Sequence, residues 1–118
     1  MKSDREITCA IFDVAGMQAL NDQRGYEFGD QLLQDLETEL NSAFDSYFLT
    51  RLSGDEFLVS RAGDAADFNS KAQAFAQKFR DRFAIEVTWG LGTGMTTSEA
   101  KSAAMVHLFE KRRGVHGS

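Results

Sequence analysis

The segment from Arg51 to Ser60, RLSGDEFLVS, constrains the fold more than any other part of the chain. Two adjacent carboxylates, Asp55 and Glu56, follow a Ser-Gly pair and stand between two apolar runs. Apolar runs joined by a short glycine-containing turn predict a β-hairpin, here with the acids at its tip. Neighbouring carboxylates suit a divalent cation such as Mg²⁺, which prefers oxygen ligands and often shares them with substrate phosphates. A polar turn with two solvated acids remains the alternative, because acidic turns are common.

Composition limits the class of protein. The 118 residues predict one compact domain over residues 1–118, with enough apolar content (42%) for a single core. A net charge of −5 argues against a broad nucleic-acid or anionic-membrane surface. No stretch has the length of a membrane span or the pattern of a signal peptide. We therefore expect a cytoplasmic protein without membrane or nucleic-acid partners.

The cysteine and proline content narrows the choice further. Cys9 is the single cysteine, so a disulfide framework is excluded. It lies in an apolar run, which favours a buried structural thiol over a reactive one. The chain has no proline, so its turns must be formed by Gly, Asn, Asp and Ser.

Apolar periodicity predicts the element order β-α-β-β-α-β-α. Strands are expected at 7–12, 47–52, 55–60 and 85–91, and helices at 29–44, 67–83 and 97–113, the last with Thr97 or Ser98 as its N-cap. The first strand is apolar on both faces, as a strand covered on both sides would be. The fold class is α+β. The order resembles a ferredoxin-like or palm core, an antiparallel sheet covered by helices on one face.

This topology predicts where the acids meet. Asp13 ends the first strand, and the hairpin is expected to be the neighbour of that strand in the sheet. Asp13, Asp55 and Glu56 would then share one edge of the sheet. Three carboxylates in this arrangement predict a site for metal-bound triphosphate, where two metal ions can activate a hydroxyl and stabilise the leaving pyrophosphate.

Two motifs resemble those of the GGDEF-type nucleotide cyclases, the diguanylate cyclase family. The signature reads SGDEF here, and the segment from Ile11 to Leu33, IFDVAGMQALNDQRGYEFGDQLL, resembles the family's first strand followed by N-D-x-x-G-(H/Y)-x-x-G-D. The residues in register are Asp13, Asn21, Asp22, Gly25, Gly29, Asp30 and, before the signature, Arg51. The resemblance covers residues 7–60 well and the remainder loosely.

The resemblance implies a set of metal ligands. Asp13, the backbone carbonyl of Val14 and Asp55 would bind Mg²⁺ or Mn²⁺. Glu56 would position the metal or the reacting hydroxyl. Asp13, Asp55 and Glu56 are accordingly the expected catalytic residues.

The resemblance also implies a base-binding pair. Asn21 and Asp30 would read guanine through its exocyclic amine and its ring N–H. From the residues alone, Asn21 also fits a turn, and Asp30 fits a helix N-terminal acid favoured by the helix dipole. Gly54 would allow close approach of a ligand, because it has no Cβ.

Several positions depart from the family pattern. Ser53 replaces the first signature glycine, Ala15 replaces a second aspartate, and Met17-Gln18 replaces an aromatic-lysine pair that contacts phosphate. Near the C-terminus, Lys111 and Gly114 match, but Val115 stands where arginine is expected; Arg112 or Arg113 could substitute by a shift. Met17, Gln18, Lys111 and Arg112 are therefore candidate substrate contacts. The inhibitory R-x-x-D pattern is absent from 44–47.

The resemblance implies an enzyme that condenses two nucleoside triphosphates, GTP favoured over ATP, into a cyclic dinucleotide with release of pyrophosphate. Each site would hold one triphosphate, so two chains must face each other during catalysis. One alternative, suggested by the short chain, is a minimal CRISPR polymerase of a phage-defence system that makes an adenine-containing cyclic dinucleotide. Another is a degenerate GGDEF module that binds nucleotide or a partner without turnover.

Overall fold

The computed structural model describes residues 6–63 and 65–117, with side chains up to Arg112. Four strands and four helices follow one another as β1 (Ile7–Val14), α1 (Met17–Arg24), α2 (Tyr26–Ala43), β2 (Phe48–Ser53), β3 (Glu56–Ala62), α3 (Ala65–Phe83), β4 (Val87–Gly94) and α4 (Thr97–Gly117). Among the described residues, no helix is long and apolar enough to cross a membrane.

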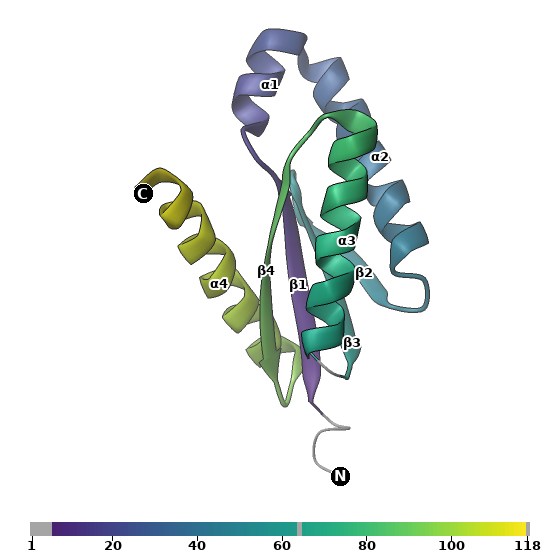
Figure 1. The fold of residues 1–118 in the computed structure, drawn as a ribbon, viewed down its shortest axis with the longest axis vertical. Coiled ribbons are helices and arrows are strands. Elements are labelled where there is room, and N and C mark those ends of the chain that lie inside the picture. Colours follow the sequence, from purple (N-terminus) through teal and green to yellow (C-terminus); the bar gives the residue numbers. More distant parts are fainter. Residues whose placement is uncertain (1–5, 64, 118) are drawn as a thin grey trace.

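The strands form one antiparallel sheet in the order β2-β3-β1-β4 (Figure 1). This is the order of a ferredoxin-like core, so the predicted fold class is confirmed. The hairpin strand β3 pairs directly with β1, as expected. The register places Asp13 opposite Glu56 on β3 and opposite Thr88 on β4.

Helices cover both faces of the sheet, so the expectation of helices on one face alone is wrong. Helices α2 and α3 pack on the face formed by alternate residues such as Phe12 and Phe57. Helix α4 packs on the other face, against Cys9, Ile11 and Leu58 (Figure 1). The alternation of side chains along a strand makes both faces of β1 apolar. The doubly covered first strand is thus confirmed, and burial raises the pKa of the Cys9 thiol.

Helix α4 lies unusually close to β4. A Cβ atom at Gly92 would overlap the backbone of Ala100 and Ala104, and one at Gly90 would overlap the backbone of Ala104 and Leu108. Ala100 and Ala104 are fully buried. Glycine on the strand and alanine on the helix therefore let the two backbones touch, which larger side chains would prevent.

Side chains of α4 also cover the outer edge of β4. The backbone N–H of Leu91 donates to Nδ1 of His107 at 2.8 Å, and Nζ of Lys111 donates to the carbonyl of Trp89 at 2.8 Å. In an edge strand, these outward backbone groups have no neighbouring strand to bond. The helix therefore supplies partners that the sheet lacks on this side.

The structure differs from the predicted boundaries at several places, of which three have a clear physical reason. Helix α1 was not predicted, because it has no fully buried residue and contacts the core only through Met17 and Leu20. Helix α2 begins at Tyr26, directly after Gly25, whose φ of 92° separates the two helices. Strand β4 continues through its glycines to Gly94 instead of ending at 91, because α4 covers them.

The predicted N-cap of the last helix, Thr97 or Ser98, is wrong by one or two residues. Oγ1 of Thr96, not of Thr97 or Ser98, accepts a hydrogen bond from the backbone N–H of Glu99 at 3.1 Å. The Glu99 side chain in turn accepts from the N–H of Met95 at 2.9 Å. This reciprocal pattern satisfies free donors at the start of α4 in the manner of a capping box.

Replacing Gly92 by alanine should destabilise the fold, because the added methyl group meets helix backbone that cannot move aside cheaply. The expected loss is about 1–3 kcal/mol of unfolding free energy, measured by urea denaturation. Gly54→Ala is the matched control, since no atom lies within 4 Å of the added Cβ, and it should change stability by less than about 0.5 kcal/mol. Equal effects of the two substitutions would contradict the close-packing argument.

Candidate functional site

Asp13 and Glu56 form a directly opposed pair of acids at one end of the sheet. Alternation along β1 and β3 places both side chains on the face that α4 covers. Like charges directly opposite each other in a sheet are destabilising, because the side chains are only about 5 Å apart. The pair therefore needs a cation, or a proton, between its members.

Arg112, from the distal part of α4, supplies that cation. Its Nη2 atom donates to Oδ2 of Asp13 and, at 3.3 Å, to Oε2 of Glu56. Sequence reasoning placed Arg112 at the phosphates of a substrate, and the ion pairs with the acids were not foreseen. The signal that could have found them is the position of α4 on the same face as Asp13 and Glu56.

The two partners of this ion pair are buried unequally, since 9% of the Asp13 side chain is exposed against 39% of Arg112. Burial raises the pKa of Asp13, Arg112 opposes this rise, and the negative charges of Asp55 and Glu56 add to it. Burial lowers the pKa of Arg112, but the Asp13 and Glu56 carboxylates raise it by more, so the net shift of this pKa is upward. Arg112 thus stays charged, while Asp13 carries an electrostatic cost that an additional cation would relieve.

The turn that carries Asp55 is fixed by Arg51. Nε of Arg51 donates to the carbonyl of Gly54 at 3.0 Å, and Nη2 of Arg51 bonds the same oxygen. Oγ of Ser53, the residue in place of a signature glycine, donates to Oε1 of Glu56 at 3.4 Å. Nothing lies within 4 Å of a Cβ built on Gly54, so the space above the turn is open to a ligand.

The predicted base-reading residues lie where α1 meets α2. Asn21 packs over Gly29, where a side chain would collide with its Oδ1 atom and would lie 2.7 Å from Cε of Met17. Oδ1 of Asn21 is buried and has no hydrogen-bond partner. Asp30, the next residue after Gly29, is exposed. A buried, unpaired acceptor thus lies over the residue that precedes an accessible carboxylate.

Three other residues predicted as substrate or metal contacts are Lys111, Gln18 and Val14. Lys111 sits over the Trp89 ring, 4.0 Å from its centroid, and bonds the Trp89 carbonyl, so in this arrangement it is not directed at the acids. Burial lowers the pKa of Lys111. Gln18 is exposed on α1, and the Val14 side chain is buried in the core. The side chains of residues 113–115 lie outside the described part of the chain.

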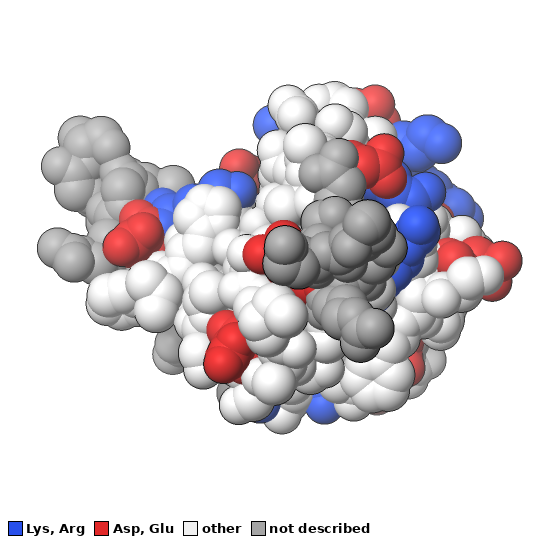
Figure 2. All heavy atoms as spheres, turned by 90° about the horizontal axis from the view of Figure 1, so that it is seen from below, with Lys and Arg blue, Asp and Glu red and all other residues white. Residues whose placement is uncertain are grey.

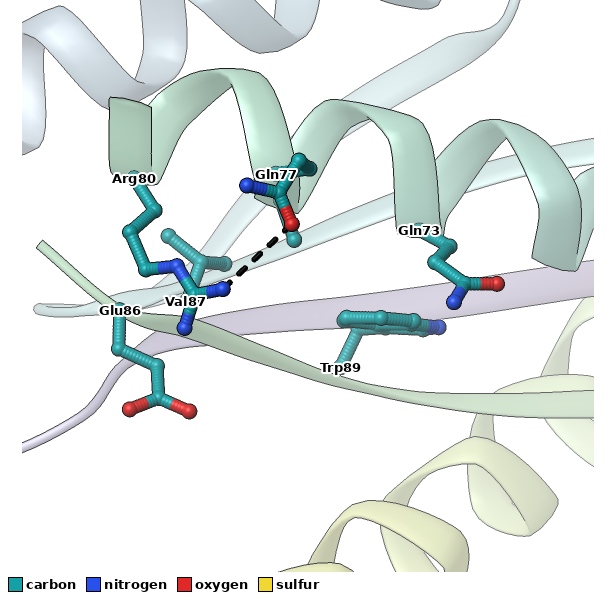
Figure 3. A pocket seen from close by; sticks show the side chains of 7 residues that line it. Gln73, Gln77, Arg80, Glu86, Val87 and Trp89 are labelled. Carbon is teal, nitrogen blue, oxygen red and sulfur yellow. Dashed lines mark hydrogen bonds between the residues drawn. The ribbon is translucent and has the colours of Figure 1, made fainter. Parts of the chain in front are cut away.

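Two hollows of the described surface lie away from the acids. One, of about 160 Å³, lies between α3 and β4, where the Trp89 ring faces Gln73 and Gln77 (Figure 3). The other is an open groove of about 600 Å³ between α2 and α3, lined in part by Lys71 and Lys78. Figure 2 shows basic side chains gathered on the side of the molecule where α2 and α3 lie, with acidic ones around them. The acids at Asp13 and Glu56 thus belong to neither hollow.

The donor chemistry at the acids fits a hard divalent cation. Oδ1 of Asp13 is buried without a partner, and carboxylate oxygens are the ligands that Mg²⁺ prefers. Among the described side chains, which end at Arg112, however, no three acidic, histidine or cysteine groups are already arranged to hold a metal ion. The guanidinium of Arg112 lies against Asp13, which is an expected ligand, and against Glu56 beside it.

The fold, the paired acids and the SGDEF turn together define a family. The family model described as "Diguanylate cyclase, GGDEF domain" matches residues 1–108, so the chain belongs to the GGDEF family. Arg112 lies beyond the matched residues. GGDEF cyclases generally use Mg²⁺.

Two curated relatives cover part of the chain. The signaling protein YkoW of Bacillus subtilis is 36% identical over 74 residues, which are 62% of this chain and 9% of that protein. A protein of Sinorhizobium fredii is 41% identical over 70 residues, 58% of this chain and 8% of its own length. The chain therefore spans less than a tenth of the length of either relative.

Solved structures show the same fold. The active GGEEF domain of a diguanylate cyclase from Vibrio cholerae aligns with a TM-score of 0.75 at 22% identity, over 92% of this chain and 78% of that one. The GGDEF domain of DgcB from Caulobacter crescentus, in complex with c-di-GMP, aligns with a TM-score of 0.79 at 19% identity, over 92% and 73%.

Removing the Arg51 side chain should loosen the acidic turn. Arg51→Ala deletes both bonds to the Gly54 carbonyl, and we expect NMR order parameters of the backbone at residues 54–56 to fall toward the flexible range, below about 0.6. Arg61→Ala is the control, because Arg61 lies over the Tyr47 ring at the other end of the hairpin. Unchanged order parameters in Arg51→Ala would show that the turn holds its shape without these bonds.

Proposed function

We propose that this GGDEF domain is a nucleotidyltransferase that condenses two molecules of GTP into a cyclic dinucleotide and releases pyrophosphate. The observation that carries the proposal is the opposed pair of Asp13 and Glu56 on β1 and β3, with Asp55 in the adjoining turn. The negative charge of Asp55 acts on Asp13, which supports their proximity. A module with only a structural role has no need of three close carboxylates at the rim of its sheet.

Asp13, Asp55 and the Val14 carbonyl would hold Mg²⁺, with Glu56 beside them. The bound metal would supply charge stabilisation for the triphosphate and lower the pKa of the attacking hydroxyl. Ser53 and Arg51 would keep the turn, and with it Asp55, in a fixed position. Preorganised ligands matter here because phosphoryl transfer relies mainly on positioning and electrostatics.

Asn21 and Asp30 would select guanine. The unpaired Oδ1 of Asn21 is an acceptor, and the carboxylate of Asp30 is a second one. Guanine presents two donors, N1–H and the N2 amine, whereas adenine presents an acceptor at N1. Leaving a polar group mispaired costs about 1–3 kcal/mol, so a preference of roughly tenfold to a hundredfold for GTP is expected.

The reaction requires two copies of the domain. One set of acids and one base-reading pair serve one triphosphate, so cyclisation needs a second, facing active site. We propose a homodimer that forms at least during catalysis.

The second candidate function is nucleotide binding without turnover. The ion pairs of Arg112 with Asp13 and Glu56 favour it, because they neutralise the acids without any metal. Val115, in place of an expected arginine, points the same way.

Incubation of the protein with each nucleoside triphosphate and Mg²⁺ or Mn²⁺, followed by mass spectrometry, tests the proposal. We expect a cyclic dinucleotide from GTP, and Asp55→Ala should abolish it while changing the unfolding free energy by at most about 1 kcal/mol. Asp45→Ala, at an exposed acid between α2 and β2, is the control and should retain activity. An adenine product would overturn the guanine assignment, and no product under any condition would favour the non-catalytic module.

Gly29→Ala tests the base-reading pair. The new methyl group must displace the Asn21 amide, which is the end of a flexible side chain, so the GTP over ATP preference in competition binding should fall by about tenfold. Stability should change little, because alanine improves helix propensity by about 1 kcal/mol over glycine. Ala19→Gly, at an exposed position of α1, controls for changes in helix stability. Unaltered selectivity in Gly29→Ala would place base recognition elsewhere.

A further inference from the structure

We propose that Arg112 is a tethered cation that occupies Asp13 and Glu56 until a triphosphate draws it away, so that metal and nucleotide bind in a coupled manner. This inference rests on the proposed function of the same site. It assigns to Arg112 a positioning and regulating role beyond that of a phosphate contact.

The packing of α4 on β4 places Arg112 beside the acids. Gly94 contacts Ala100, Gly92 contacts Ala104 and Gly90 contacts Leu108, so four helix residues accompany two strand residues. These steps match in length, because four residues of helix rise about 6 Å and two residues of strand about 6.7 Å. The next step of the series brings Arg112 level with Thr88.

Thr88 is the β4 neighbour of Asp13, and Asp13 is the neighbour of Glu56. The three side chains form a row across β4, β1 and β3 on the face of α4. Arg112 therefore reaches the acids from a rigid support, and its ion pairs follow from the backbone packing of α4.

Arg112 and a divalent cation compete for the same two carboxylates. One guanidinium nitrogen contacts Oδ2 of Asp13 and Oε2 of Glu56. A metal ion at these atoms would place two cationic groups within a few ångströms of each other in a partly buried site, where charges interact strongly. Arg112 must therefore withdraw before a metal ion can be held at Asp13 with Glu56 beside it.

A triphosphate would attract the Arg112 guanidinium away from Asp13 and Glu56. The Arg112 side chain is 39% exposed, so it has room to turn toward solvent on a flexible stem. Guanidinium groups bind phosphate oxygens through paired, charge-assisted hydrogen bonds. The nucleotide would thus remove the competing cation and expose the acids in one event, and linkage requires each ligand to favour the other.

Arg112→Gln should have opposite effects on the two ligands. In isothermal titration without nucleotide, Mn²⁺ should bind the variant at least tenfold more tightly than the wild type, because its competitor is gone. In EDTA, the same variant should bind GTP at least fivefold more weakly. A purely structural loss would weaken both, so the opposed signs identify the proposed role.

Matched variants separate charge from structure. Arg112→Lys keeps a cation and should remain within about threefold of the wild type for Mn²⁺. Lys101→Gln removes the same charge at an exposed position of α4 far from the acids and should leave Mn²⁺ affinity unchanged. Asp13→Asn should abolish the gain seen in Arg112→Gln when the two are combined. If Arg112→Gln fails to fold by circular dichroism, Arg112→Met keeps the apolar stem and serves in its place.

Equal Mn²⁺ affinities in the wild type and Arg112→Gln, or binding by neither, would overturn the proposal. Tighter Mn²⁺ binding with unchanged GTP affinity would overturn the part assigned to the triphosphate. None of these measurements requires turnover. A protein that forms no cyclic dinucleotide can therefore still support the competition, and an active enzyme can still refute it.

Discussion

The close approach of α4 to β4 is the constraint on which the rest of the site depends. Gly90 and Gly92 let the helix backbone lie directly on the strand, and the fully buried Ala100 and Ala104 complete the contact. Wider packing would move the far end of α4 away from the sheet. The ion pairs of Arg112 thus depend on residues several turns away that carry no charge.

The carboxylates of the acidic site carry an electrostatic cost in the folded protein. Asp13 is buried beside Glu56, and its raised pKa reflects a carboxylate that burial and its acidic neighbours disfavour as an anion. Arg112 offsets part of this cost but leaves Oδ1 of Asp13 without a partner. Such uncompensated polar groups are found where a ligand is expected to complete the set.

Much of the fold could be predicted from the sequence, because apolar periodicity marks strands and helices that pack on the core. The prediction that Asp13 and Glu56 are neighbours followed from the expected order of the strands. Helix α1 could not be predicted, since Met17 and Leu20 make its contacts with the core and neither is fully buried. The predicted strand at 85–91 stopped short of Gly92 and Gly94, because the role of these glycines becomes visible only when α4 is placed on them.

Within the site, residues identified by local motifs were easier to predict than residues brought in from a distance. The SGDEF turn and the Asn21 segment are contiguous patterns whose spacing carries information. Arg112 is 56 residues from Glu56 and 99 from Asp13, and its contacts depend on which face of the sheet α4 covers. The sequence analysis expected all helices on one face of the sheet, so the ion pairs of Arg112 could not be predicted.

The side chains that cover the outer edge of β4 limit how this domain can assemble. His107 and Lys111 already use the N–H of Leu91 and the carbonyl of Trp89. An extended segment from another chain would have to displace both side chains before it could extend the sheet on this side. Growth of the sheet by strand addition is therefore directed to β2, at the opposite margin, which leaves the α4 side to be joined through side chains alone.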